Sequence, residues 1–83
     1  MGKFDSLINR LKENPRNVQF ADLVKVCTYF FGSPMIRGSH HYFTVPWPGE
    51  PLVNIQNDGG KAKTYQVKQV LAAIEVLKGM SDV

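Results

Sequence analysis

The sequence has too few cysteines for a disulfide and no apolar run long enough to cross a membrane. Cys27 is the only cysteine among 83 residues, and one cysteine with two histidines gives no recognisable zinc-ligand spacing. No stretch has the length and apolar character of a membrane span or of a signal-peptide core. We therefore expect a cytoplasmic protein with no membrane association, no structural metal and no cofactor.

Size and composition favour one small globular domain over residues 1–83. Hydrophobic residues make up 43% of the chain, and nine residues are aromatic (five Phe, three Tyr and one Trp), so disorder is not expected. The chain is long enough for a core but too short for a deep cofactor cavity as well. Ten Lys and Arg against seven Asp and Glu give a net charge of +3, which permits nucleic-acid binding without demonstrating it.

Apolar residues recur at helical spacing in three segments. The first helix is expected to stop before Asn14-Pro15, and the second to end at Gly32. The third is expected to begin with Thr64 as N-cap and to end at Gly79. The apolar positions are Phe4, Leu7, Ile8 and Leu11 in the first, Phe20, Leu23, Val24, Cys27, Phe30 and Phe31 in the second, and Val67, Val70, Leu71, Ile74 and Leu77 in the third.

Between the second and third helices, the sequence predicts two or three antiparallel strands. Residues 35–37, 40–45 and 52–56 read as strands, whereas residues 46–51 contain three prolines and are expected to form a turn-rich connection. Residues 57–60, Asn-Asp-Gly-Gly, are expected to form a loop. Helices packed on one face of a small antiparallel sheet make an α+β two-layer sandwich.

The segment Gly38-Ser39-His40-His41 has evident catalytic potential, because histidine can take and give a proton near neutral pH. Strand alternation places the two histidines on opposite faces. His41 is expected to be buried and hydrogen-bonded on the core face, together with Phe43. His40 is expected to point to solvent, together with Tyr42. Taken alone, adjacent histidines at a strand start are more often structural than catalytic. Both interpretations stay open on local chemistry.

The excess of positive charge concentrates late in the chain, since residues 61–78 hold four Lys against one Glu. Lys61 and Lys63 lie just before the third helix, after two glycines. A helix N-terminus offers free N–H groups and positive partial charge, which favour a phosphate. The segment lacks the Gly-Lys-Ser/Thr ending of a Walker loop. A phosphate site and an ordinary solvated loop are therefore both open, with Lys68 and Arg37 as further candidate phosphate contacts.

Two other residues invite a functional interpretation. Trp47, between two prolines, is expected to close a loop over the core, although it could also stack a base or anchor a partner. Cys27 lies on an apolar helix stripe and is expected to be a core residue and not a nucleophile. Ser39 beside His40 does not make a catalytic triad.

Several motifs together resemble HicA-type toxins in their order and spacing. The similarity runs from about Asn14 to Leu77, and residues 1–14 form an N-terminal helical extension ahead of it. Thr64 stands where the family commonly has a proline, which changes how the helix starts but removes no chemical group. The matching segments are Gly38–Phe43, Val53–Asn57, Gly60–Lys63 and Tyr65–Val70.

The resemblance implies a fold like the double-stranded-RNA-binding domain, endoribonuclease activity on messenger RNA, and a HicB-type antitoxin protein as partner. In the family, the histidine directly after Gly-Ser is catalytic, which here is His40. We expect metal-independent cleavage by His40, with Lys61, Lys63, Arg37 and Lys68 binding RNA. Two alternatives remain: a non-catalytic RNA-binding module of the same fold, and a DNA- or protein-binding regulator that uses the proline-rich loop.

Overall fold

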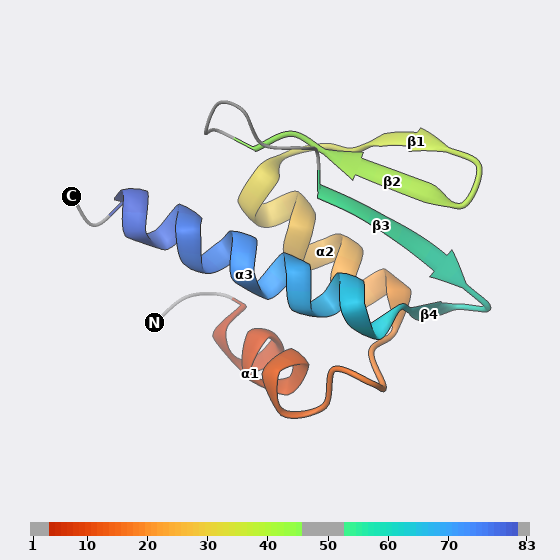
Figure 1. Ribbon diagram of the computed structural model, residues 1–83, viewed down its shortest axis with the longest axis horizontal. Coiled ribbons are helices and arrows are strands. Elements are labelled where there is room, and N and C mark those ends of the chain that lie inside the picture. The colour runs from red at the N-terminus through yellow and green to blue at the C-terminus, as the bar shows by residue number, and fades with distance from the viewer. Residues whose placement is uncertain (1–3, 46–52, 82–83) are drawn as a thin grey trace.

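The computed structural model describes residues 4–45 and 53–81, and within these ranges two helices precede four strands and a third helix follows them (Figure 1). The expected connection over residues 46–51, with Trp47, lies outside the described residues, as does Leu52. The elements are α1 (Asp5–Glu13), α2 (Phe20–Phe31), β1 (Met35–Arg37), β2 (His40–Phe43), β3 (Val53–Asp58), β4 (Lys61–Ala62) and α3 (Thr64–Ser81).

The first two helices end where the sequence predicts. Asn14 is the C-cap of α1, and its N–H donates to the carbonyl of Arg10 at 3.0 Å before Pro15 prevents a further turn. Gly32 is the C-cap of α2 and has a φ of +91°, a conformation that glycine adopts without a steric cost.

The predicted ends of α3 are both wrong. Thr64 is already helical, and the carbonyl of the preceding Lys63 accepts the N–H of Gln66 at 3.0 Å, so Lys63 holds the N-cap position. The helix also continues through Gly79 to Ser81, because an interior glycine weakens a helix by only about 1 kcal/mol and does not have to end it. No helix in the described ranges is both long and apolar enough to cross a membrane.

The sheet is antiparallel throughout, in the order β1-β2-β3-β4. The predicted loop over residues 57–60 is only half right: Asn57 and Asp58 belong to β3, and the turn contracts to Gly59-Gly60, whose φ angles are +62° and +89°. The chain then pairs back as β4, a strand that the sequence did not predict. Residues 18–20 flank the far side of β4, since Ala62 N–H donates to the Val18 carbonyl at 2.9 Å.

One face of the sheet is covered by α2 and α3, and α1 packs against both of these helices (Figure 1). Phe43 and Ile55 point from the sheet into this layer and are fully buried. The α+β two-layer sandwich is therefore confirmed, whereas the likeness to a double-stranded-RNA-binding domain stays a prediction. The buried apolar residues are Ile8, Leu11, Val18, Phe20, Leu23, Val26, Cys27, Phe43, Ile55, Ala62, Val67, Val70 and Ile74.

Candidate functional site

The polar site lies on the face of the sheet opposite α2 and α3. Because successive strand residues alternate between faces, burial of Phe43 and Ile55 on the helix side directs their neighbours to the other side. The register pairs His40 with Gln56 and Tyr42 with Asn54, so residues from both strands share this outer face. We define the outer face by its side chains from the four strands: Met35, Arg37, His40, Tyr42, Asn54, Gln56, Asp58 and Lys61.

The imidazole of His40 is half-buried and held from two directions. Its Nδ1 lies 3.1 Å from Oδ1 of Asn54, a diagonal neighbour across the β2–β3 pair. Its ring stacks on Tyr42, with 5.9 Å between ring centroids and 18° between ring planes. His40 begins β2 directly after the β1–β2 turn, where Gly38 has a φ of +59°. The predicted catalytic histidine is thus placed on an open face in a defined orientation.

A chain of hydrogen bonds connects the start of α3 to the turn before His40. Gln66 is 2% exposed, and its Oε1 accepts the backbone N–H of Gln56 at 2.8 Å. The side-chain Nε2 of Gln56 donates to the Ser39 hydroxyl at 3.3 Å, and Asn57 N–H donates to the Ser39 carbonyl at 2.9 Å. β4 is only two residues long and pairs with Asn57 and Asp58 of β3. The preceding residue of β3, Gln56, therefore donates its N–H to the side chain of Gln66 and not to a strand.

His41 lies on the core side of β2, as its alternation with His40 predicts. Its ring meets Phe20 edge to face, with centroids 5.0 Å apart. The side chain is only half-buried, however, and the expected hydrogen bond is missing at Nδ1, a buried atom with no partner in the described structure. Alternation predicts the face of a side chain correctly, but it does not reveal whether an acceptor lies within reach.

The four predicted phosphate-binding residues are not all on one surface. Arg37 of β1 and Lys61 of β4 belong to the outer face, at opposite sides of the sheet. Lys63 follows β4 and precedes α3, whereas Lys68 is exposed on α3, in the other layer. The structure therefore brings Arg37 and Lys61 onto the face of His40, and it separates Lys68 from them.

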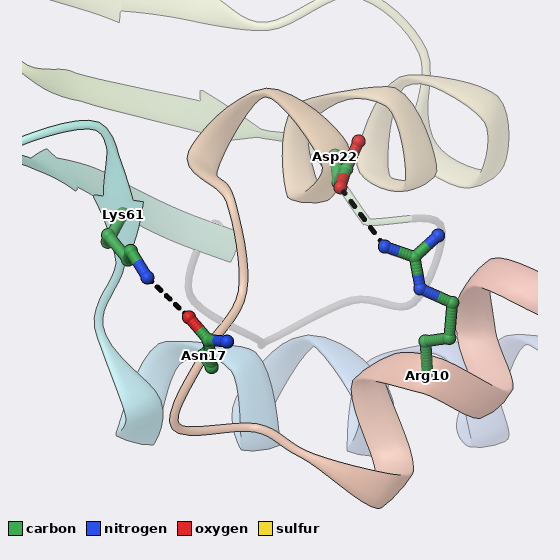
Figure 2. A network of polar contacts seen from close by, with 4 residues as sticks. All are labelled: Arg10, Asn17, Asp22 and Lys61. Atoms are coloured by element: carbon green, nitrogen blue, oxygen red, sulfur yellow. Dashed lines mark hydrogen bonds and ion pairs between the residues drawn. The ribbon is translucent and has the colours of Figure 1, made fainter.

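Lys61 already has a partner within the protein. Its ammonium donates to Oδ1 of Asn17, in the connection between α1 and α2, as Figure 2 shows. The ammonium carries three N–H groups, so one bond to an amide leaves donors for a phosphate. Nearby, Arg10 of α1 and Asp22 of α2 form an exposed ion pair at 3.9 Å (Figure 2).

A cavity of about 340 Å³ lies beside these contacts and away from His40. Residues of α1, of the first turn of α2 and of the connection between the two helices line it, and no strand residue does. His40 instead lies on the sheet face that no described helix covers, and such a face suits a long polymeric ligand better than a small enclosed one. The lining residues are Leu7, Arg10, Leu11, Glu13, Asn14, Asn17, Val18, Gln19 and Asp22.

Neither a thiol nucleophile nor a metal cluster is found among the described residues. Cys27 is a core residue, as expected, and burial raises the pKa of its thiol to about 12, which keeps the sulfur in its unreactive neutral form. Across residues 4–45 and 53–81, no three His, Cys, Asp or Glu side chains gather as metal ligands do.

Three residues of the site escaped the sequence reasoning: Asn54, Gln56 and Gln66. A signal for the first two was present, because Asn54 and Gln56 alternate with Val53 and Ile55 and so must share the face of His40. For Gln66 the signal was its helical spacing, because it lies four residues before Val70 and eight before Ile74 and so shares their buried face. Comparison with known proteins identifies no family for the chain: no family model, no curated protein and no solved structure matches it.

Proposed function

We propose that the protein is an endoribonuclease with His40 as its catalytic base. The observation that carries this proposal is the placement of His40 on the sheet face that no described helix covers, oriented by Asn54 and Tyr42. Arg37 and Lys61 place positive charge on the same face. A histidine, an aromatic ring, amides and cations on one open surface meet the needs of RNA cleavage.

The proposed reaction is cleavage within single-stranded or loosely paired RNA. His40 takes the proton of a ribose 2′-hydroxyl, and the resulting oxygen attacks the adjacent phosphorus. The bond from phosphorus to the 5′-oxygen breaks, and that oxygen takes a proton from solvent. The products carry a 2′,3′-cyclic phosphate and a 5′-hydroxyl, and His40 returns its proton to water. No step is assigned to a metal ion.

The histidine and the cations would accelerate the proposed reaction in different ways. A positioned general base accelerates a reaction by about 10²- to 10⁴-fold. Arg37, opposite His40 in the register, stabilises the negative charge that grows on the phosphate oxygens, and Lys61 and Lys63 hold other phosphates near the N-terminus of α3. Binding is through phosphates and stacked bases, so affinity falls with added salt.

The resemblance to HicA-type toxins gives this activity a biological setting. We propose that the substrate is messenger RNA in the cytoplasm, that the fold is like the double-stranded-RNA-binding domain, and that a HicB-type antitoxin neutralises the protein. His40 in Gly38-Ser39-His40 supports this assignment, since it is the histidine that the family uses.

The experiment that tests the proposal is induction in bacteria. Wild-type protein should arrest growth and deplete messenger RNA, whereas His40→Ala should be tolerated at equal abundance. Thr44→Ala, a change at an exposed residue beyond β2, is the control and should remain toxic. Equal toxicity of the wild type and His40→Ala would remove His40 from the catalytic role.

The alternative is an RNA-binding module without catalysis. The stacked pair of His40 and Tyr42 favours it, because stacked rings can receive a base without any proton transfer. A binder would hold RNA intact, and His40→Ala would lower its affinity. A nuclease would lose cleavage in His40→Ala and keep most of its affinity.

A further inference from the structure

The hydrogen bond between His40 and Asn54 determines which nitrogen of the imidazole carries its proton. The distance from His40 Nδ1 to Asn54 Oδ1 is 3.1 Å. The Asn54 amide is placed with its oxygen toward the ring, and an amide oxygen can only accept, so this orientation makes Nδ1 the donor. A neutral imidazole carries one N–H, and Nε2 is then left with its lone pair.

We propose that Asn54 is the positioning residue of the site: it holds the proton of His40 on Nδ1 and so makes Nε2 the atom that takes a proton from RNA. This assignment rests on the proposed function for its catalytic part. Asn54 does not touch the reacting atoms, and it acts through His40.

Two neighbours restrict the imidazole in complementary ways. Tyr42 lies nearly parallel to the ring, which limits its tilt. Asn54 limits rotation about the last side-chain bond, because a half-turn of the ring would put a carbon in place of Nδ1 and lose the hydrogen bond. Asn54 stands on β3 opposite Tyr42 in the β2–β3 register, so backbone pairing between these strands sets its position relative to His40.

A neutral amide suits this task better than a carboxylate. A base must be uncharged before it takes a proton, and an amide oxygen orients the neutral ring without adding a negative charge that favours the imidazolium. Four other charged or titratable groups belong to this face as defined above: Arg37, Tyr42, Asp58 and Lys61. Arg37 on β1 lies opposite His40 in the register, and Lys61 on β4 lies opposite Asp58 on β3.

The tautomer is measured directly on the full-length protein by two-bond ¹H–¹⁵N NMR of the histidine rings at a pH where they are neutral. His40→Ala assigns the signals. The wild type should show the proton of His40 on Nδ1. Asn54→Leu, which keeps the size of the side chain and loses the acceptor, should remove that preference, and Asn54→Ala should do the same. Asn9→Leu, at an exposed position on α1, is the matched control and should leave it unchanged.

The catalytic part is measured as the pH dependence of RNA cleavage. Asn54→Asp places a carboxylate beside Nδ1 and should move the acidic limb of the profile to higher pH by about 1 unit or more, since a nearby opposite charge shifts a titration by about 1–3 units. Asn9→Asp changes the net charge equally and should leave the limb in place. Asn54→Leu should lower kcat by at least about tenfold with little change in KM, because a histidine base in the wrong tautomer can lose about 10⁴-fold.

The two measurements separate failure of this inference from failure of the proposed nuclease. A proton on Nε2 in the wild type, or an unchanged tautomer in Asn54→Leu, would overturn the inference whether or not RNA is cleaved. Loss of the tautomer with an unchanged kcat would overturn the catalytic role of Asn54. A wild type that holds the proton on Nδ1 through Asn54 but never cleaves RNA would overturn the proposed function and support the assignment of the tautomer.

Discussion

Replacing Gln66 by Leu should destabilise the protein mainly through loss of the hydrogen bond from the Gln56 N–H, because the other bond of Gln66, from Nε2 to the hydroxyl of exposed Tyr65, is long at 3.4 Å. Gln66 is 2% exposed, and its Oε1 accepts the Gln56 N–H at 2.8 Å. Leucine has a similar size but no acceptor, so the Gln56 N–H loses its partner. An unpaired, buried N–H costs about 1–3 kcal/mol. Part of that cost is offset because a buried leucine has no polar group to desolvate. The free energy of unfolding should therefore fall by about 1–2 kcal/mol.

The assay is thermal unfolding, since about 1 kcal/mol corresponds to about 4–8 °C in a domain of this size. Gln69→Leu, an exposed position on the same helix, is the matched control and should change the Tm much less. Hydrogen exchange at the Gln56 amide reports on the bond itself and should become faster in Gln66→Leu alone. An unchanged Tm together with a protected Gln56 amide would refute the view that Gln66 completes the ladder of β3.

Three further predictions concern the core and the cations. Cys27 should resist a thiol reagent at neutral pH in the native protein and react on unfolding, because burial raises its pKa to about 12. Rapid modification of the folded protein would contradict this burial. His41→Ala should lower the free energy of unfolding, measured in urea, by about 1 kcal/mol, since it loses the edge-to-face contact with Phe20 but no hydrogen bond at Nδ1. An inactive variant of unchanged stability would instead assign His41 to the chemistry. Replacing Lys61 and Lys63 by Ala in a His40→Ala background should flatten the plot of log RNA affinity against log salt by about 0.7 per lost phosphate contact, and an unchanged slope would mean that these lysines only support the fold.

The elements that the sequence predicts well are those with a local cause. A proline after Asn14 and a glycine at position 32 end their helices for reasons contained in a few residues. The separation of His40 from His41 follows from strand alternation alone, and the structure places His41 against Phe20 on the core side of the sheet. These features need no knowledge of distant parts of the chain.

The features that the sequence could not give depend on distant partners. The two-residue strand β4 is too short to show any periodicity, and it is held between β3 and residues 18–20. Lys61 meets Asn17 across 44 positions of sequence, so its intramolecular hydrogen bond has no local signature. Helical spacing places Gln66 on the buried face of α3 with Val70, but its partner depends on the end of β4, which leaves the Gln56 N–H without a backbone acceptor.

The most direct test of the account is cleavage of an end-labelled, single-stranded RNA by purified protein in excess EDTA. The wild type should cut the RNA and leave 2′,3′-cyclic phosphate and 5′-hydroxyl ends, whereas folded His40→Ala should leave it intact. A 2′-deoxy residue at the cut site should also prevent cleavage, because the attacking hydroxyl is then missing. Equal cleavage by His40→Ala, products with 5′-phosphate ends, or loss of activity in EDTA that magnesium restores would contradict a metal-independent mechanism based on His40.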